Sequence, residues 1–353
     1  MNIKRKNTAY SLLDLALVSA GNTAKDTYLN SLELAQKVEQ LGYTRYWLAE
    51  HHNAVSIASS ATVVLIGYIA QGTTSIRVGS GGIMLPNHSS LIVAEQFGTL
   101  GSLYTDRIDL GIGRAPGTDQ VTAFAIRPDH IQALHKFPEE INTIQQYFSC
   151  DNHTAKVRAP VAEGVQVPLY ILGSSTNSAY LAAKKGLPYA FASHFAPAQL
   201  MDALTIYRNN FQPSEHLKAP YTIAGINVIA ADTNEAAEKM STTLLRAILG
   251  ILTNNRACLQ PPTEMNTEMR QIAQHPAIQQ MLQHCFVGNK ERVKQQTLSF
   301  LEQTKVDEVI VATHVYDAED RVHSYELFAE VMKEVNEKIE QRSEHREQRL
   351  DSF

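Results

Sequence analysis

Short apolar runs of strand length alternate along this chain with longer segments in which apolar residues recur at helical spacing. This alternation is typical of consecutive strand–helix units, because parallel strands that helices cover on both faces are apolar throughout. Eight such units predict an α/β fold, a closed (β/α)8 barrel of the TIM type. The expected strands cover residues 11–17, 45–49, 76–83, 108–112, 169–172, 189–192, 221–230 and 308–312.

An open, doubly wound parallel sheet is the main alternative to the barrel. Such sheets often bind dinucleotides through a G-x-G-x-x-G motif between a strand and a helix. The nearest match here, Gly111-x-Gly113-x-x-Pro116, lacks the third glycine, and no acidic partner stands where the motif needs one. We therefore favour the barrel.

Two segments lack the strand–helix alternation. Residues 150–168 predict a hairpin or loop insertion. Residues 254–286, which are rich in proline, glutamine and methionine, predict an irregular insertion between strands 7 and 8. We expect a single domain over residues 1–342, followed by a charged tail at residues 343–353.

The composition argues against nucleic acid and membrane partners. The 353 residues include 31 basic and 36 acidic side chains, and no basic block is interleaved with aromatics, so we expect no nucleic acid partner. No stretch approaches the roughly 20 apolar residues of a membrane span. The three cysteines have no C-x-x-C spacing, and residues 1–9 do not resemble a signal peptide, so we expect a cytoplasmic protein with reduced thiols.

Glu50, His51 and His52 directly follow the second expected strand. In barrels the reactive side chains gather at the carboxyl ends of the strands, so these residues are candidates for acid–base chemistry. A solvated loop is the alternative interpretation. A metal site built from His51, His194 and Glu50 is a further one, although no H-x-H motif or second carboxylate cluster supports it, and we expect no metal.

Two further features lie at the same predicted end of the barrel. Arg114 follows the fourth strand, and Ser174 and Ser175 stand at a strand-to-helix turn, so a guanidinium and a helix N-terminus offer a site for phosphate. Taken singly, the arginine could form a surface ion pair and the serines a helix cap. Gly81-Gly82 interrupt the third strand, which predicts either a bend or the close approach of a flat ring.

These residues fall within motifs that resemble the luciferase-like flavin monooxygenases, in particular a bacterial subgroup of luciferase-like oxidoreductases. The resemblance covers nearly the whole chain, and its motifs are Trp47–His52, Val78–Pro86, Ala94-Glu95-Gln96, Arg107–Gly117, Leu172–Ser175, Phe286-Val287-Gly288 and Asp307–Thr313.

The resemblance implies a barrel that binds FMN. It implies His51 and Glu50 as catalytic residues, and a cis peptide beneath the flavin at Gly81-Gly82. The implied cofactor contacts are Gly81, Gly82, Arg114, Gly173, Ser174, Ser175 and Ser178. We expect the substrate pocket to include His52, Asn87, His194 and Phe195.

By the same resemblance, we expect a monooxygenase that uses reduced FMN and O2 to oxygenate a small organic substrate, with the reduced flavin supplied by a separate reductase. A homodimer through residues 59–70 and 90–104 is expected, and residues 254–284 correspond to a lid. Bacterial luciferase has a cysteine where this chain has Gly113, so light emission is not implied. A deazaflavin-dependent oxidoreductase and a non-catalytic flavin-binding protein are the alternatives.

Overall fold

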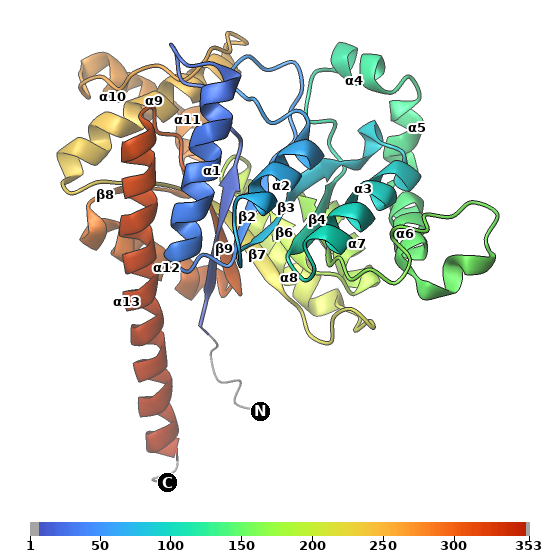
Figure 1. Ribbon diagram of the computed structural model, residues 1–353. Coiled ribbons are helices and arrows are strands. Elements are labelled where there is room, and N and C mark those ends of the chain that lie inside the picture. The colour runs from blue at the N-terminus through green and yellow to red at the C-terminus, as the bar shows by residue number, and fades with distance from the viewer. Residues whose placement is uncertain (1–6, 351–353) are drawn as a thin grey trace.

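The computed structural model describes residues 7–350, with side chains to residue 341, and forms a closed barrel of eight parallel strands surrounded by helices (Figure 1). The barrel closes because β6 pairs with β7, and β9 pairs with both β7 and β1. The predicted (β/α)8 fold is therefore confirmed. Its strands are β1 (Ala9–Asp14), β2 (Arg45–Leu48), β3 (Arg77–Met84), β4 (Ile108–Gly113), β5 (Leu169–Gly173), β6 (Tyr189–Phe191), β7 (Thr222–Ala230) and β9 (Glu308–Ala312).

A ninth strand, β8 (Cys285–Gly288), was not predicted and lies outside the barrel. It pairs with Asn227–Ala230, the second half of β7. The nine residues of β7 extend past the three-residue β6, which pairs only with Thr222–Ala224, and this leaves a free edge that β8 covers. This short strand ends the segment that lacks strand–helix alternation, and its pairing with β7 defines it, so sequence patterns did not separate it from the insertion.

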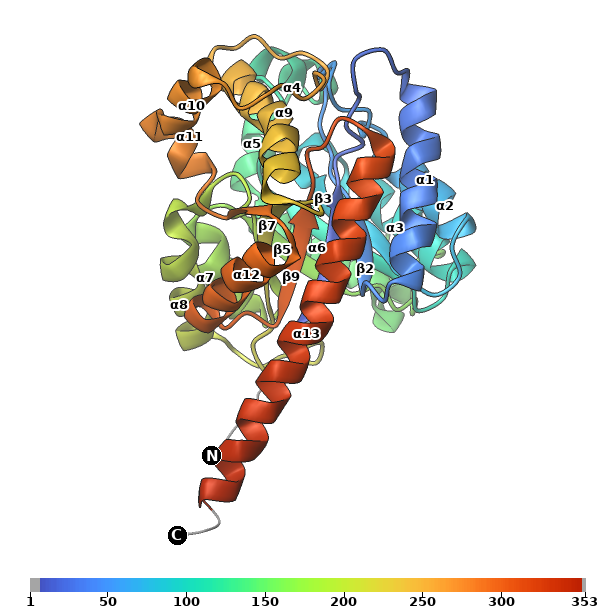
Figure 2. The ribbon, with the colours of Figure 1, turned by 90° about the vertical axis from the view of Figure 1, so that its left-hand side faces the viewer.

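Most helices fall where the periodicity predicts them. The long ones are α1 (Ala24–Gln40), α2 (Thr62–Gln71), α3 (Ser90–Leu103), α6 (Phe137–Phe148), α7 (Thr176–Lys185), α8 (Leu200–Asn210), α9 (Asn234–Leu252), α12 (Lys290–Thr304) and α13 (Ala318–Leu350). The short ones are α4 (Gln120–Ile126), α5 (His130–His135), α10 (Thr267–Gln274) and α11 (Pro276–Met281). Figures 1 and 2 show α4, α9, α10 and α11 at one end of the barrel. Among the described residues, no helix is long and apolar enough to cross a membrane.

Several predicted boundaries were wrong for local reasons. The sequence periodicity predicts one helix over residues 129–148, whereas the structure has two, α5 and α6, which meet at Lys136. Pro138 stands in the first turn of α6 and favours the start of a new helix there. The pattern Asp232-x-x-Glu235 predicts a capping box that starts α9 at Asp232, but the Thr233 side chain caps the helix and accepts a hydrogen bond from the Ala236 N–H. Asn289, which the sequence predicts as the cap of α12, does cap that helix.

The C-terminal helix is longer than expected. Helix α13 continues through the segment that we predicted as a charged tail, as far as Leu350, and it projects well beyond the barrel in Figure 2. Charged side chains such as Glu, Lys and Arg have high helix propensity, and so a charged composition does not by itself end a helix. Residues 351–353 of that tail lie outside the described residues.

A network of buried ions fills the interior at the amino ends of the strands. Arg45 donates to Asp109 (2.7 Å) and Glu308 (2.8 Å), and all three side chains are at most 5% exposed. Arg77 and the Trp47 indole also donate to Asp109, at 2.6 Å and 3.1 Å. Polar interactions therefore fix this end of the barrel.

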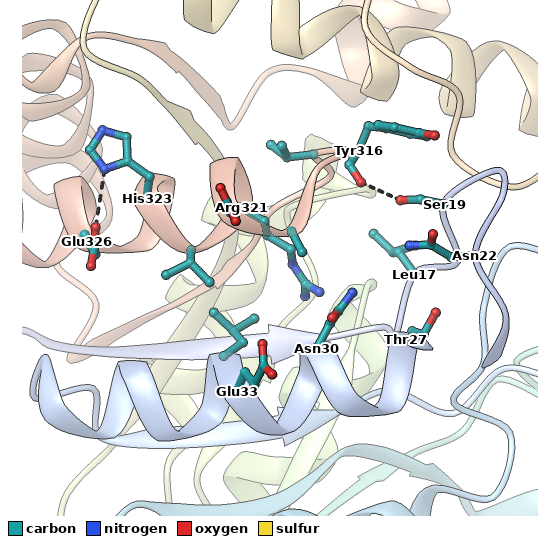
Figure 3. A pocket seen from close by; sticks show the side chains of 15 residues that line it. Leu17, Ser19, Asn22, Thr27, Asn30, Glu33, Tyr316, Arg321, His323 and Glu326 are labelled. Carbon is teal, nitrogen blue, oxygen red and sulfur yellow. Dashed lines mark hydrogen bonds and ion pairs between the residues drawn. The ribbon is translucent and has the colours of Figure 1, made fainter. Parts of the chain in front are cut away.

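A small pocket of about 230 Å³ lies on the outside of the barrel, between α1 and the start of α13 (Figure 3). Arg321 lines it and donates to the buried Asp14 at 2.6 Å, while Ser19 donates to the Tyr316 carbonyl at 2.6 Å. These two hydrogen bonds connect the start of α13 and the loop before it to the end of β1 and the loop after it.

Candidate active site

A cavity of about 880 Å³ opens at the carboxyl ends of the barrel strands. This volume lies in the range of pockets that hold a small molecule or cofactor. The cavity brings together most of the predicted site residues, which come from different strand ends. Those that line it are His51, His52, Gly81, Arg114, Gly173, Ser174, Ser175, Ser178, His194 and Phe195. Glu50, Gly82 and Asn87 do not line it and lie behind its wall.

His51 presents one free ring nitrogen at the cavity. Its Nδ1 lies 3.1 Å from the Gly117 carbonyl, and because a carbonyl only accepts, Nδ1 carries the proton. Burial lowers the pKa of His51, and the bond to Gly117 opposes that shift only partly. The neutral ring therefore keeps the lone pair of Nε2 available as a proton acceptor.

Glu50 is a buried anchor behind the cavity wall. Its carboxylate accepts hydrogen bonds from His52 Nε2 (2.9 Å), His88 Nε2 (2.9 Å), the Met84 N–H (3.0 Å) and Asn87 Nδ2 (3.1 Å). These bonds join the end of β2 to η1 (Leu85–Asn87), which follows β3. The geometry favours a positioning role for Glu50, in which the carboxylate holds His52 at the cavity. His88, which sequence analysis did not select, belongs to this anchor.

Glu50 is expected to make the protein less stable in acid. Burial acts to raise its pKa, but the hydrogen bonds from His52 and His88 outweigh burial and lower the pKa from 4.5 to about 2. A carboxyl whose pKa falls on folding stabilises the native state above its unfolded pKa, and the stabilisation disappears as pH falls towards its folded pKa. Its contribution, roughly 3 kcal/mol, should therefore disappear between about pH 4.5 and 2.

The measurement is the free energy of unfolding in urea from pH 7 to pH 3, compared between wild type and Glu50→Gln. The difference between the two proteins should shrink as pH falls. Glu268→Gln, at an exposed position on α10, is the matched control and should follow wild type. A constant difference between wild type and Glu50→Gln would contradict the prediction.

The ends of β4 and β5 offer donors for an anion. Arg114, after β4, is exposed to the cavity and enters no ion pair among the described residues. Ser175 precedes the ten-residue helix α7, and its side chain makes no capping hydrogen bond. Ser178 donates to the Ser175 carbonyl at 2.7 Å, so it orders this turn. The helix start and the guanidinium together suit a phosphate group.

Glycines expose backbone along part of the wall. The Gly81–Gly82 peptide bond is cis, as the resemblance implies, and the β3–β4 register shifts between Gly81 and Ile83. A Cβ on Gly81 would lie 2.7 Å from Leu13 Cδ1, and a Cβ on Gly113 would lie 2.9 Å from Met84 Cε. A side chain at either position would have to displace a neighbouring side chain. The glycines leave the backbone uncovered, so a flat group in the cavity can approach it.

Two histidines lie deeper in the cavity. The Nδ1 atoms of His194 and His314 are buried without a hydrogen-bond partner. Burial lowers the pKa of His194 to about 3 and that of His314 to about 4, so both rings are neutral near pH 7. His314 was missed by sequence analysis, because no motif marks the loop after β9. Among the side chains that the structure describes, no three His, Cys, Asp or Glu residues form a group that could hold a metal ion.

Residues 255–260, within the predicted insertion, line the cavity and form a roof over it. Leu259 pairs with Ser19: its N–H donates to the Val18 carbonyl and its carbonyl accepts from the Ala20 N–H, both at 2.8 Å. Cys258 Sγ lies 3.4 Å from the Val55 carbonyl. The roof therefore rests on the loops that follow β1 and β2.

A parallel barrel with a histidine, donors suited to an anion and a cofactor-sized cavity at the strand ends has the architecture of an α/β-barrel enzyme. The chain belongs to the luciferase-like monooxygenase family, whose model matches residues 9–308. The family assignment agrees with the resemblance found in the sequence motifs, and the enzyme is accordingly a monooxygenase of this family.

Two curated relatives cover nearly the whole chain. A luciferase-like monooxygenase of Escherichia coli (strain K12) is 45% identical, over 94% of this chain and 98% of its own length. An N-acetyl-S-alkylcysteine monooxygenase of Bacillus subtilis (strain 168) is 32% identical, over 91% of this chain and 97% of its own.

Solved structures support the same fold. Apo-MsnO8 has a TM-score of 0.83 at 31% identity, covering 92% of this chain and 98% of its own. The oxygenating constituent of 3,6-diketocamphane monooxygenase of Pseudomonas putida, in complex with FMN, has a TM-score of 0.68 at 16% identity, with coverages of 92% and 97%. An F420-dependent secondary alcohol dehydrogenase has a TM-score of 0.66 at 14% identity, with coverages of 94% and 99%. At these two lower identities the likeness concerns the fold alone.

Proposed function

We propose that this protein is an FMN-dependent monooxygenase that oxygenates a small organic substrate with O2, using reduced FMN from a separate reductase. The observation that carries the proposal is that three features line one cavity. These are Arg114, which forms no ion pair among the described residues, the Ser175 turn, which lacks a side-chain cap, and His51, whose Nε2 is free. The donors suit a phosphate and the glycine-lined wall suits a flat ring, so the residues present fit FMN.

Each part of the cavity has a role in this proposal. Bound reduced FMN supplies the electrons with which one atom of O2 enters the substrate and the other leaves as water. His51 accepts or returns a proton at Nε2, and the Gly117 carbonyl holds its ring in the required tautomer. Arg114, Ser174 and Ser175 orient the phosphate. The roof at residues 255–260 excludes water from the reaction.

The test is a titration of the purified protein with FMN and with riboflavin, which lacks the phosphate, in oxidised and anaerobically reduced forms. Arg114→Gln should weaken FMN binding by about 10- to 100-fold, since a hydrogen bond to a charged group contributes about 1.5–3 kcal/mol. The same change should leave riboflavin binding unaltered, because no phosphate is present to pair with the guanidinium. The exposed Arg270, on α10, provides Arg270→Gln as the matched control.

Wild-type protein that binds riboflavin as tightly as FMN would contradict the phosphate assignment. Binding of a deazaflavin but of neither flavin would replace the proposal with the alternative of a deazaflavin-dependent oxidoreductase, which transfers hydride without O2. Bound flavin without any oxygenation in the presence of a reductase would favour a non-catalytic flavin-binding protein.

We also propose that the protein forms a homodimer through α2 and α3. Large apolar side chains stand exposed on both helices: Val64 on α2 is 70% exposed and Leu103 at the end of α3 is 67% exposed. Apolar surface of this kind is typical of protein interfaces. A monomeric mass in analytical ultracentrifugation would contradict the dimer, and Val64→Glu should shift a wild-type dimer towards monomer.

A further inference from the structure

The cavity wall carries positive charge and no acidic side chain. Arg114, Arg246 and Arg256 line it, whereas no aspartate or glutamate does. The chain as a whole is acidic, with a net charge of −5, so composition does not account for this. Among the described residues none of the three pairs with a carboxylate, and Arg246 bonds only the Pro261 carbonyl, at 3.1 Å. Because a guanidinium remains protonated at any ordinary pH, the cavity holds uncompensated charge.

Arg246 and Arg256 lie in a different sector of the barrel from Arg114. Arg114 follows β4, whereas Arg246 belongs to α9, which follows β7, and two strands separate β4 from β7 in the sheet. Arg256 belongs to the roof, which Leu259 fastens to the loop after β1. A single phosphate beside Arg114 and the α7 turn therefore leaves two arginines for a second anionic group.

One of these two arginines, Arg256, lies near the reacting centre. The positive charge of Arg256 is among the causes that lower the pKa of His51, after burial, which places the guanidinium within electrostatic reach of that imidazole. Apolar side chains, among them Leu13, Ile57 and Ile248, line the same cavity. A ligand that fits this part of the cavity combines an apolar body with an anionic end.

We propose that Arg246 and Arg256 form the recognition site for an anionic group of the substrate, so that the substrate is a small apolar molecule bearing a carboxylate or sulfonate. This inference rests on the proposed function, which assigns Arg114 to the cofactor phosphate. The planar guanidinium matches the two oxygens of such a group, and no acidic side chain in the cavity competes for it. A neutral or cationic substrate would leave both guanidinium groups without an anionic partner in the cavity.

The test compares four probes of equal chain length by isothermal titration calorimetry, with and without bound oxidised FMN. These are octanoate, octane-1-sulfonate, octan-1-ol and octylammonium. The two anions should bind wild-type protein about tenfold or more tightly than the alcohol, since one charge-assisted hydrogen bond contributes at least that factor. The cation should bind most weakly. The tighter of the two anions identifies the carboxylate or the sulfonate as the substrate group. Equal binding of octan-1-ol and both anions would overturn the proposal.

Variants locate the anion within the cavity. Arg246→Gln and Arg256→Gln should each reduce the preference for anions about tenfold, and the double variant should abolish it. Arg270→Gln, in the same insertion but outside the cavity, should retain the preference. Circular dichroism and thermal melting of each variant report whether it is folded. A preference that survives in the folded double variant, or that only Arg114→Gln removes, would overturn the proposal.

The FMN–riboflavin titration keeps the two hypotheses distinguishable. If FMN fails to bind, but octanoate still binds wild-type protein more tightly than the double variant, the proposed function fails and the anion site stands. If FMN binds through Arg114 and the anions show no preference, the function stands and the substrate class is wrong. If the double variant lowers FMN affinity as much as Arg114→Gln does, all three arginines serve the cofactor and the substrate site is overturned.

Discussion

Replacing His51 by alanine is expected to lower the turnover of substrate by about 10²- to 10⁴-fold, the usual contribution of a general acid–base residue. Turnover falls because the variant lacks Nε2, the free ring nitrogen that exchanges the proton at the cavity. In wild type, the hydrogen bond from Nδ1 to the Gly117 carbonyl holds the ring in place. FMN affinity should change little, since Arg114 and the α7 turn lie on another side of the cavity. The measurement is the incorporation of labelled oxygen from O2 into product.

The pH dependence of turnover provides an independent check on His51. Burial lowers its pKa below 6.5, so the wild-type rate should fall on the acid side, with an inflection below that value. The acid limb should disappear in His51→Ala, because no imidazole remains to be protonated. His216→Ala, at an exposed position, is the matched control and should keep the wild-type rate and profile. Full activity in His51→Ala would exclude His51 as the proton-transfer group.

Asp109→Ala is expected to reduce the free energy of unfolding by about 3–5 kcal/mol, the usual cost of removing one partner of a buried ion pair. Asp109 is fully buried and accepts hydrogen bonds from Arg45, Arg77 and Trp47. Its removal leaves Arg45 with Glu308 as its remaining carboxylate partner. Chemical denaturation at neutral pH measures the change.

The matched control for this variant is Asp202→Ala, at an exposed position in the first turn of α8. Its effect should stay within about 0.5 kcal/mol, as is usual for surface substitutions. A similar loss of stability in both variants would show that the buried network does not carry the effect. An unchanged free energy of unfolding in Asp109→Ala would also contradict the prediction.

The periodicity of the sequence was sufficient to predict the eight barrel strands, because a buried parallel strand and an amphipathic helix leave distinct patterns. It was insufficient for β8, which is four residues long and is defined by its pairing with the free edge of β7. The end of α13 was also misjudged, since charged residues are compatible with a projecting helix.

Among the site residues, the motifs selected those that stand directly after strands, such as His51, Arg114 and Ser175. They did not select His314, Arg246 or Arg256, which reach the cavity from loops and from α9. They also could not separate His51, which faces the cavity, from its neighbour Glu50, which lies behind the wall. Adjacent residues at a strand end share a motif but point to different environments.

The sequence by itself determined the barrel and the end of it at which chemistry occurs, since hydrophobic period and strand order are local properties of the chain. Only the tertiary structure decided which groups meet there and in what state. The free Nε2 of His51, the anchored carboxylate of Glu50 and the unpaired charges of Arg246 and Arg256 depend on neighbours distant in sequence. Burial and hydrogen bonding set the charge and orientation of each group, and both arise only when the strands close into a barrel.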